Sequence, residues 1–224
     1  MRSVLTVLLP SRGRPLRFKE CLQSLLNTSE NAEVSVYLDE DDETKDQYPS
    51  LDGRVRYTVG PRIWTAKIIK KLMAECDTEY MMFGADDILF KTDDWDKTLM
   101  KAVPKDGIGL AYGNDKWKGA PGHFVFHRKW YELTGMYPEG FIHFGPDGYA
   151  VKVMETLDRG RMRYIPQVEI PHLHFRNGLA PSDKTYEEER AVGDGRQALE
   201  DALRDQLPKD LEILKAYLAC SSTP

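Results

Sequence analysis

The run from Tyr80 to Phe90 constrains the fold more than any other part of the chain. It reads YMMFGADDILF, so two adjacent carboxylates, Asp86 and Asp87, follow an apolar stretch of strand length that is bounded by a glycine. A buried strand here places both acids at its carboxyl end, where open α/β sheets bind ligands. Two acids at one place repel each other unless a positive group lies between them, and a divalent cation carrying a diphosphate suits carboxylate oxygens. A second interpretation is that the segment is a polar turn in which one of the two acids caps the next helix.

Composition argues against several other classes of protein. The 224 residues include 31 basic and 36 acidic side chains, and the formal net charge of -5 disfavours non-specific binding of nucleic acid by the whole surface. The three cysteines are too few and too far apart for a disulfide framework or a zinc knuckle. No apolar stretch approaches the ~20 residues of a membrane-spanning helix, and the first ten residues resemble a strand rather than a signal peptide. We therefore expect a reduced, cytoplasmic protein without integral membrane contact.

Strand and helix patterns alternate along the first half of the chain. Their order predicts a mostly parallel sheet with right-handed crossovers and flanking helices, an α/β fold of the Rossmann-like kind. The predicted strands cover residues 4–9, 34–38, 55–59 and 80–83, and the predicted helices cover residues 16–26 and 64–75.

The second half is less regular. We expect an α/β domain over residues 1–180 and a C-terminal helical segment, residues 181–224, packed on it as an appendage. The predicted strands cover residues 108–112, 123–126 and 163–170, the last broken by Pro166, and the predicted helices cover 128–133, 148–159, 186–206 and 211–218.

Four segments, in this order over roughly residues 3–175, resemble those of family 2-type glycosyltransferases of the GT-A fold. Residues 10–15 (PSRGRP) are similar to the family's P-[ST]-x-x-R-P start, which contacts the nucleotide. The second predicted strand ends in Asp39, where the family places a carboxylate against the base. Residues 83–87 (FGADD) resemble the Asp-x-Asp-Asp metal motif, and residues 145–149 (GPDGY) resemble the segment that supplies the catalytic base.

Two positions depart from the family pattern. Gly84 stands where the family usually has its first Asp, whereas Asp86 stands at the motif's metal-binding Asp, so metal coordination can survive with one anchor fewer. Pro146 replaces the usual Glu before Asp147, which leaves Asp147 alone for the role of base.

The resemblance implies a donor site built mainly from the first half of the chain. It implies metal-dependent transfer of a sugar from a nucleotide-sugar, by default a UDP-sugar, with Mn²⁺ or Mg²⁺ neutralising the diphosphate that leaves. Arginine suits bidentate phosphate contacts, and lysine acts as a point charge. The expected donor-binding residues are Pro10, Ser11, Arg12, Arg14, Asp39, Asp41, Arg62, Lys67 and the metal ligand Asp86.

Asp147 is the candidate catalytic base. Glycosyl transfer passes through an oxocarbenium-like state, and a carboxylate on the face opposite to the diphosphate takes the proton of the acceptor hydroxyl. This role implies inversion at the anomeric carbon. In the alternative, Asp147 caps the following helix, because the sequence Pro-Asp-Gly favours a turn and a cap.

Histidines and one tryptophan complete the predicted site. His172 and His174 lie two residues apart at the end of a predicted strand, so their side chains point to one face, and neutral imidazoles at this spacing can complete a metal site. The resemblance supports this role, because GT-A enzymes often take a ligand from a histidine near the end of the catalytic core. The alternative is a pair of half-buried structural histidines. Trp117, in a polar loop with glycines, and His143, just before Asp147, are the expected acceptor contacts.

Three functions remain open at this point. The leading hypothesis is a metal-dependent inverting glycosyltransferase, hexosyltransferase-like, whose acceptor is a glycan, a protein or a modified nucleobase. A nucleotidyltransferase acting on a sugar phosphate is the first alternative, although its usual glycine-rich basic loop is poorly matched by residues 11–15, with one glycine. The second is a catalytically inactive nucleotide-sugar-binding module, which the departures at Gly84 and Pro146 keep open.

Overall fold

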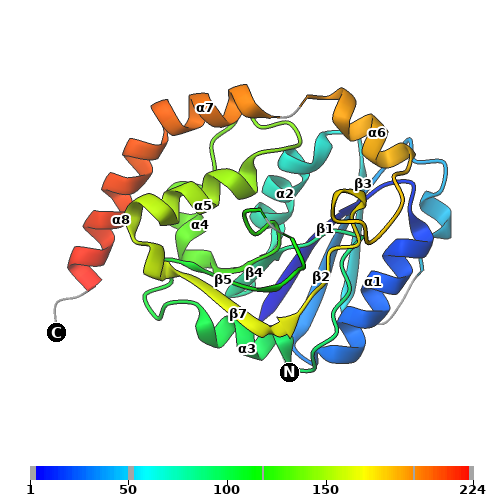
Figure 1. Cartoon of the computed structure of the whole chain (residues 1–224), viewed down its shortest axis with the longest axis horizontal. Coiled ribbons are helices and arrows are strands. Elements are labelled where there is room, and N and C mark those ends of the chain that lie inside the picture. The colour runs from blue at the N-terminus through cyan, green and yellow to red at the C-terminus, as the bar shows by residue number, and fades with distance from the viewer. Residues whose placement is uncertain (1–3, 50–52, 118, 194, 222–224) are drawn as a thin grey trace.

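The computed structural model describes residues 4–49, 53–117, 119–193 and 195–221 (Figure 1). Within these residues one sheet of seven strands runs through the molecule in the order β3-β2-β1-β4-β6-β5-β7. The strands are β1 (Leu5–Ser11), β2 (Ala32–Asp39), β3 (Val55–Gly60), β4 (Tyr80–Phe83), β5 (Leu110–Asn114), β6 (Val125–His127) and β7 (Met162–Glu169).

Helices connect most of these strands. The α-helices are α1 (Pro15–Thr28), α2 (Trp64–Glu75), α3 (Trp95–Ala102), α4 (Arg128–Thr134), α5 (Pro146–Leu157), α6 (Lys184–Ala191), α7 (Arg196–Asp205) and α8 (Leu207–Ser221). Three short 3-10 turns are η1 (Lys45–Gln47), η2 (Arg159–Arg161) and η3 (Phe175–Asn177). None of the helices in these described residues is long and apolar enough to cross a membrane.

The sheet is mostly parallel, which confirms the predicted fold class. β1 pairs in parallel with both β2 and β4, β2 with β3, and β5 with β7, whereas β6 runs antiparallel to its neighbours β4 and β5. The carboxyl ends of β1, β2 and β4 therefore meet at one edge of the sheet. Because the chain order reverses at β1, between β2 and β4, this edge has the crevice in which open α/β sheets bind ligands.

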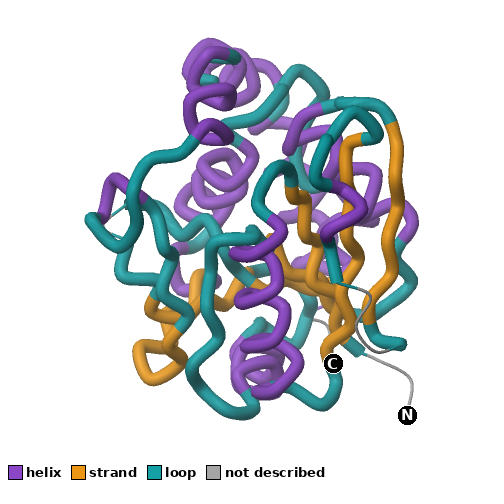
Figure 2. The backbone as a smooth tube through the Cα atoms, turned by 90° about the vertical axis from the view of Figure 1, so that its right-hand side faces the viewer, coloured by secondary structure: helices purple, strands orange, loops and turns teal. Residues whose placement is uncertain are grey.

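Helices cover both faces of the sheet (Figure 2). Side chains of β1 alternate between the two cores, so that Leu8 packs with α2, α4 and α5 on one face and Val7 packs with α1 and α3 on the other. Burial on both faces explains why the central strands β1 and β4 have nearly continuous apolar sequences rather than alternating ones.

The C-terminal helices belong to the core of the molecule. α7 and α8 pack against α5, Leu214 of α8 is fully buried, and the Tyr149 hydroxyl lies 2.7 Å from Asp210 Oδ2. The single helix predicted over 186–206 is wrong, because two glycines with positive φ, Gly193 at 104° and Gly195 at 68°, separate α6 from α7. The division of the chain at residue 180 stays a prediction.

Two other expectations concern β7 and α5. β7 is one strand from Met162 to Glu169, but its ladder with β5 shifts register between Tyr164 and Glu169, so the pairing is irregular around Pro166, in keeping with the predicted break. β7 is an edge strand that pairs with β5 alone among the described strands, and an edge tolerates a residue without an N–H group. α5 begins at Pro146 and not at Gly148, because proline is already set for the first position of a helix.

Candidate functional site

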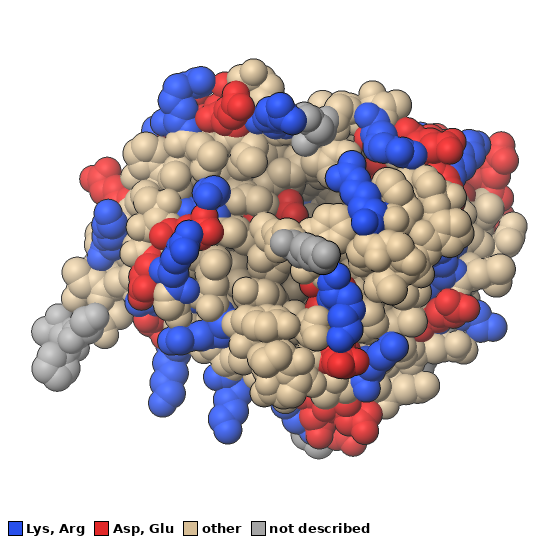
Figure 3. All heavy atoms as spheres, viewed as in Figure 1, with Lys and Arg blue, Asp and Glu red and all other residues tan. Residues whose placement is uncertain are grey.

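A cavity of about 530 Å³ opens at the carboxyl ends of β1, β2 and β4. The surface in Figure 3 carries acidic and basic side chains intermixed across the face shown. Most residues predicted for the site line this cavity, although they come from distant parts of the sequence. They are Pro10, Ser11, Arg12, Arg14, Asp39, Arg62, Asp86, Trp117, His143, Asp147, His172 and His174.

Two predicted donor-binding residues lie elsewhere. Lys67 is exposed and does not line the cavity, because α2 turns Ala66 and Ile68 inward, and the intervening residue faces solvent. The side chain of Asp41 is 56% exposed and also lies outside the lining. Asp41 still acts on the site through Arg12, whose Nη1 donates a hydrogen bond of 2.5 Å to Asp41 Oδ1.

Asp86 is held by basic and polar groups of the loop after β1. Arg14 Nη1 lies 3.2 Å from Asp86 Oδ1, and the Ser11 hydroxyl donates a 2.6 Å hydrogen bond to Asp86 Oδ2. Burial raises the pKa of Asp86; the Arg14 guanidinium opposes this rise, and the neighbouring carboxylate of Asp87 adds to it. Asp86 therefore pairs with Arg14, which also stacks its guanidinium 3.9 Å from the centre of the Tyr186 ring.

Asp87 points to the other side, toward His172. Its Oδ1 atom lies 3.2 Å from His172 Nε2, and its Oδ2 atom accepts a 2.5 Å hydrogen bond from the Tyr186 hydroxyl. The carboxylate is buried, which by itself raises the pKa of Asp87, but the contacts with His172 and Tyr186 outweigh burial and lower it. The acid beside the predicted histidine ligand is thus Asp87, while Asp86 faces Arg14, because adjacent side chains here leave the backbone in different directions.

Close packing explains the glycine in the acid-bearing segment. A Cβ atom at Gly84 would lie 2.7 Å from Val7 Cγ1 and 3.1 Å from the carbonyl oxygen of Leu8. The Gly84 amide donates a 2.9 Å hydrogen bond to that carbonyl, which draws the segment against β1. The backbone therefore leaves no room here for the Asp that the family usually carries.

A cluster of charges follows the ends of β1 and β2. Asp39 Oδ2 lies 3.2 Å from Arg12 Nη1 and 3.9 Å from Arg62 Nε, and the Arg62 guanidinium lies 4.0 Å from the centre of the Trp64 ring. Asp39 Oδ1 is buried and makes no hydrogen bond within the described residues. Burial raises the pKa of Asp39, against the pull of Arg12. This oxygen is available to accept a hydrogen bond from a ligand, as a nucleobase N–H would supply.

Helix α6 packs over the same loop. Glu188 Oε2 lies 2.8 Å from Arg62 Nη2 and 3.6 Å from Arg12 Nε, and Asp183, just before the helix, lies 2.7 Å from Arg14 Nη2. These contacts join residues more than 120 positions apart. Sequence reasoning missed them, because no local pattern marks an acid that pairs across such a separation.

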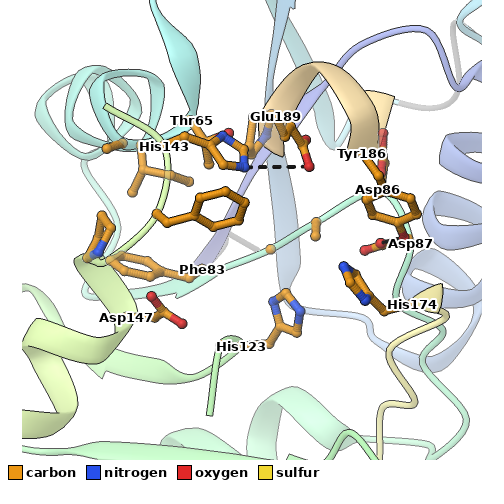
Figure 4. Close-up of a pocket in the computed structure, with 18 of the residues that line it drawn as sticks. Thr65, Phe83, Asp86, Asp87, His123, His143, Asp147, His174, Tyr186 and Glu189 are labelled. Carbon is orange, nitrogen blue, oxygen red and sulfur yellow. Dashed lines mark hydrogen bonds and ion pairs between the residues drawn. The ribbon is translucent and has the colours of Figure 1, made fainter. Parts of the chain in front are cut away.

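Asp147 lies on the opposite side of the cavity from Asp86 and Asp87 (Figure 4). It is the second residue of α5, and the helix begins after Gly145. The φ of Gly145 is 111°, and a Cβ atom there would lie 2.5 Å from Phe141 Cε1, so the position requires glycine. Burial raises the pKa of Asp147, although amides at the start of the helix oppose the rise. A carboxyl group with a raised pKa is a stronger base once it is ionised.

Aromatic rings form the wall near Asp87. The Trp117 ring lies 5.9 Å from His172 and 5.5 Å from His174, and the His123 ring lies 4.8 Å from His172, edge to face. Burial and the neighbouring His172 lower the pKa of His123 to about 3, and burial lowers that of His174 to about 4. Both imidazoles are therefore neutral at physiological pH. His143 lies across the cavity, with Nε2 3.5 Å from Glu189.

The residues that could hold a metal ion are few. Among the described residues no group of three or more His, Cys, Asp or Glu side chains is arranged to hold one. Asp87 and His172 do offer two ligands side by side, with Asp87 Oδ1 3.2 Å from His172 Nε2. A divalent cation bound with a diphosphate takes one or two protein carboxylates and fills its other positions with phosphate oxygens and water. The pair fits such a shared site.

Solved structures of glycosyltransferases share this fold. The mannosyltransferase PcManGT from Pyrobaculum calidifontis, in complex with GDP-Man and Mn²⁺, is similar at 15% identity and a TM-score of 0.61, covering 100% of this chain and 77% of that chain. S. aureus TarS 1–349 is similar at 11% identity and a TM-score of 0.54, and its complex with UDP at 10% and 0.56. Those two matches cover 76% of this chain, which spans 59% of each TarS chain. These likenesses confirm the predicted GT-A fold.

Sequence comparison identifies the family. No curated protein sequence matches this chain significantly. The model of glycosyl transferase family 2 matches residues 6–159, which is more than half of the chain and includes β1, β2, β4 and the start of α5. The chain therefore belongs to glycosyl transferase family 2.

Proposed function

We propose that this glycosyltransferase moves a sugar from a nucleotide-sugar donor to an acceptor hydroxyl in one inverting step. The observation that carries the proposal is the arrangement of carboxylates in one cavity. Asp39 lies at the end of β2, Asp86 and Asp87 follow β4, and Asp147 faces them from the start of α5. Asp39 is placed to meet the nucleobase, and Asp86 and Asp87 are placed to meet the diphosphate end of the donor. Asp147 is placed to meet the attacking hydroxyl of the acceptor.

The chemical step needs a base on the side of the sugar away from the diphosphate. The acceptor oxygen attacks the anomeric carbon as its proton passes to the Asp147 carboxylate, and the bond from that carbon to the diphosphate oxygen breaks with its electron pair on the oxygen. One displacement from the opposite face inverts the anomeric configuration. The diphosphate leaves with an added negative charge, which Arg14 and Arg12 are placed to balance.

A divalent cation, Mn²⁺ or Mg²⁺, is part of the proposal. Asp87 and His172 are its proposed protein ligands. Asp86 is instead paired with Arg14, and the ring of His174 lies beside that of His172. When bound, the cation would neutralise charge on the diphosphate. The structure of PcManGT carries Mn²⁺ beside GDP-Man, which supports this choice of ion by analogy of fold alone.

The donor and the acceptor are narrower proposals. A UDP-sugar is our first candidate donor and GDP-mannose the second, since similar folds bind UDP and GDP-Man. Trp117 and His143, which both line the cavity, are the proposed acceptor contacts. A glycan, a protein or a modified nucleobase as acceptor stays a prediction, as does the cytoplasmic location.

Binding and turnover of donors test the proposal directly. We would measure the thermal stability of the protein with UDP-, GDP-, CDP- and TDP-sugars, each with and without Mn²⁺, and then follow release of the nucleoside diphosphate. We expect a metal-dependent rise in the midpoint of unfolding with one nucleotide, and loss of that rise in Asp87→Asn. Asp106→Asn, which removes a surface carboxylate paired with Arg161 outside the cavity, is the control that should keep it.

Two results would count against the proposal. If no donor shifts the midpoint with or without metal, the cavity does not bind nucleotide-sugars. If one donor binds but no diphosphate is released with any acceptor or with water, the chain is the inactive binding module considered above.

A further inference from the structure

His123 is a buried polar side chain of the cavity that the proposed reaction leaves unused. It lies just before β6 and lines the cavity. Both ring nitrogens are buried, and neither has a well-aligned hydrogen-bond partner within the described residues. Leaving a buried donor or acceptor unpaired costs free energy, so such groups usually pair with a ligand or an ordered water molecule.

The position of His123 indicates which part of a ligand it meets. A Cβ atom at the preceding Gly122 would lie 3.8 Å from Asp147 Oδ2, so the segment that carries His123 passes beside the proposed catalytic base. On its other side the ring contacts His172, which pairs with Asp87 at the proposed diphosphate end. Figure 4 shows His123 pointing into the space between Asp147 and His174.

The transferred sugar has to occupy this same space. Its anomeric carbon is bonded to the diphosphate on one side and is attacked from the side of the base, so the ring lies between the two ends. A sugar ring presents hydroxyl groups, each of which donates one hydrogen bond and accepts others. An imidazole has two ring nitrogens that can form hydrogen bonds, so the two groups are complementary.

We propose that His123 hydrogen-bonds a hydroxyl group of the transferred sugar and so helps to select the sugar and to fix its position. The inference rests on the proposed function and adds a specificity-determining residue to it. A site built to pair with a hydroxyl group rejects a sugar that lacks it, because the buried nitrogen is then left unpaired. His123 thus contributes to binding of the sugar and not of the nucleotide.

The test compares donors with their nucleoside diphosphates. Calorimetric titrations would give the affinity of UDP, UDP-glucose, GDP and GDP-mannose in Mn²⁺ for the whole chain and for His123→Phe, which keeps a planar ring without polar atoms. We expect the variant to bind the diphosphates as the parent does and to bind the preferred nucleotide-sugar about tenfold more weakly. Its thermal midpoint should be unchanged or higher, since no protein hydrogen bond is lost.

His127→Phe is the matched control. His127 Nδ1 accepts a 2.9 Å hydrogen bond from the Lys129 amide, and Nε2 lies 3.2 Å from Glu79, so this histidine has a structural role outside the cavity. Its replacement should lower the thermal midpoint and leave the ratio of nucleotide-sugar to diphosphate affinity unchanged. His123→Gln, which keeps a donor and an acceptor, should retain part of the sugar's contribution to affinity.

The outcomes separate this inference from the proposed function. If the parent protein binds none of the four ligands and none of the CDP- and TDP-sugars tested above, the proposed function fails and the inference falls with it. If the parent binds them but the ratio of affinities is the same in His123→Phe, only the inference is overturned. A fall in the thermal midpoint of His123→Phe with an unchanged ratio would likewise assign the histidine a structural role.

Discussion

At the scale of single residues, three carboxylates of one cavity differ because their neighbours differ. Asp86 is paired with Arg14, Asp87 is held by His172 and Tyr186, and Asp147 has the amides of a helix start near it. The place of these acids in one cavity could be predicted from the sequence, since each follows a predicted strand or precedes a predicted helix, whereas their roles stay predictions. Tyr186 could not, because it approaches Asp87 from 99 positions away and belongs to no motif.

Asp147→Asn should remove activity and stabilise the fold. As the general base, Asp147 is expected to contribute about 10²–10⁴-fold to kcat. Because burial raises its pKa, the folded protein binds this proton more tightly than the unfolded chain does, and the stability of the parent falls as pH rises through the raised pKa. The asparagine variant has no such loss, so its midpoint of unfolding should exceed that of the parent at pH 7.5.

The pH dependence provides the control for this effect. The difference in midpoint should shrink as the pH falls toward the ordinary pKa of aspartate, about 3.9, where the parent carboxyl is also neutral. In parallel, kcat of the parent should fall on acidification with a midpoint above that value. A variant as stable as the parent, or less stable, at pH 7.5 would contradict an ionised Asp147 whose pKa is raised by partial burial.

At the scale of elements, α6 joins the C-terminal part of the chain to the donor site. Helices and strands of the first half followed their hydrophobic patterns closely, because those patterns record burial against the sheet. α6 has a largely polar sequence and one buried side chain, Tyr186, so its position depends on ion pairs with Arg12, Arg14 and Arg62. Such pairs leave no periodic signal in a sequence, which is why its place over the site could not be predicted.

Glu188→Gln should strengthen binding of a diphosphate. The carboxylate of Glu188 lies against Arg12 and Arg62, so it competes with a bound anion for the same guanidinium groups. Its neutral replacement should raise the affinity for UDP or GDP several-fold at low salt and cost about 1 kcal/mol of stability, the upper end for pairs that remain partly open to solvent, as these are. Calorimetric titration at two salt concentrations would measure the gain in affinity and its screening by salt, and thermal unfolding would measure the change in stability.

Glu187→Gln is the matched control on the same helix. Glu187 is exposed and does not line the cavity, so its replacement changes the net charge by the same amount without freeing either arginine. Equal gains in affinity for the two variants would mean that overall charge, and not release of Arg12 and Arg62, is responsible. No gain for Glu188→Gln would mean that the diphosphate does not reach these groups.

At the scale of the whole molecule, the C-terminal helices and the sheet share one hydrophobic core. Leu214 of α8 is fully buried in the same cluster as Leu8 of β1 and Phe83 of β4.

Leu214→Ala should therefore lower the free energy of unfolding by about 2–5 kcal/mol, whereas Ile213→Ala, at a neighbouring position that is 40% exposed, should cost far less. The loss should affect the entire chain, because the cavity residues of β1 and β4 unfold with the cluster that contains Leu214. Urea denaturation followed by both tryptophan fluorescence and far-UV circular dichroism would then give one coincident transition, shifted to lower urea in Leu214→Ala. Two separate transitions, with only the first moved by the substitution, would show instead that residues 181–224 fold as a unit apart from the domain that carries the site.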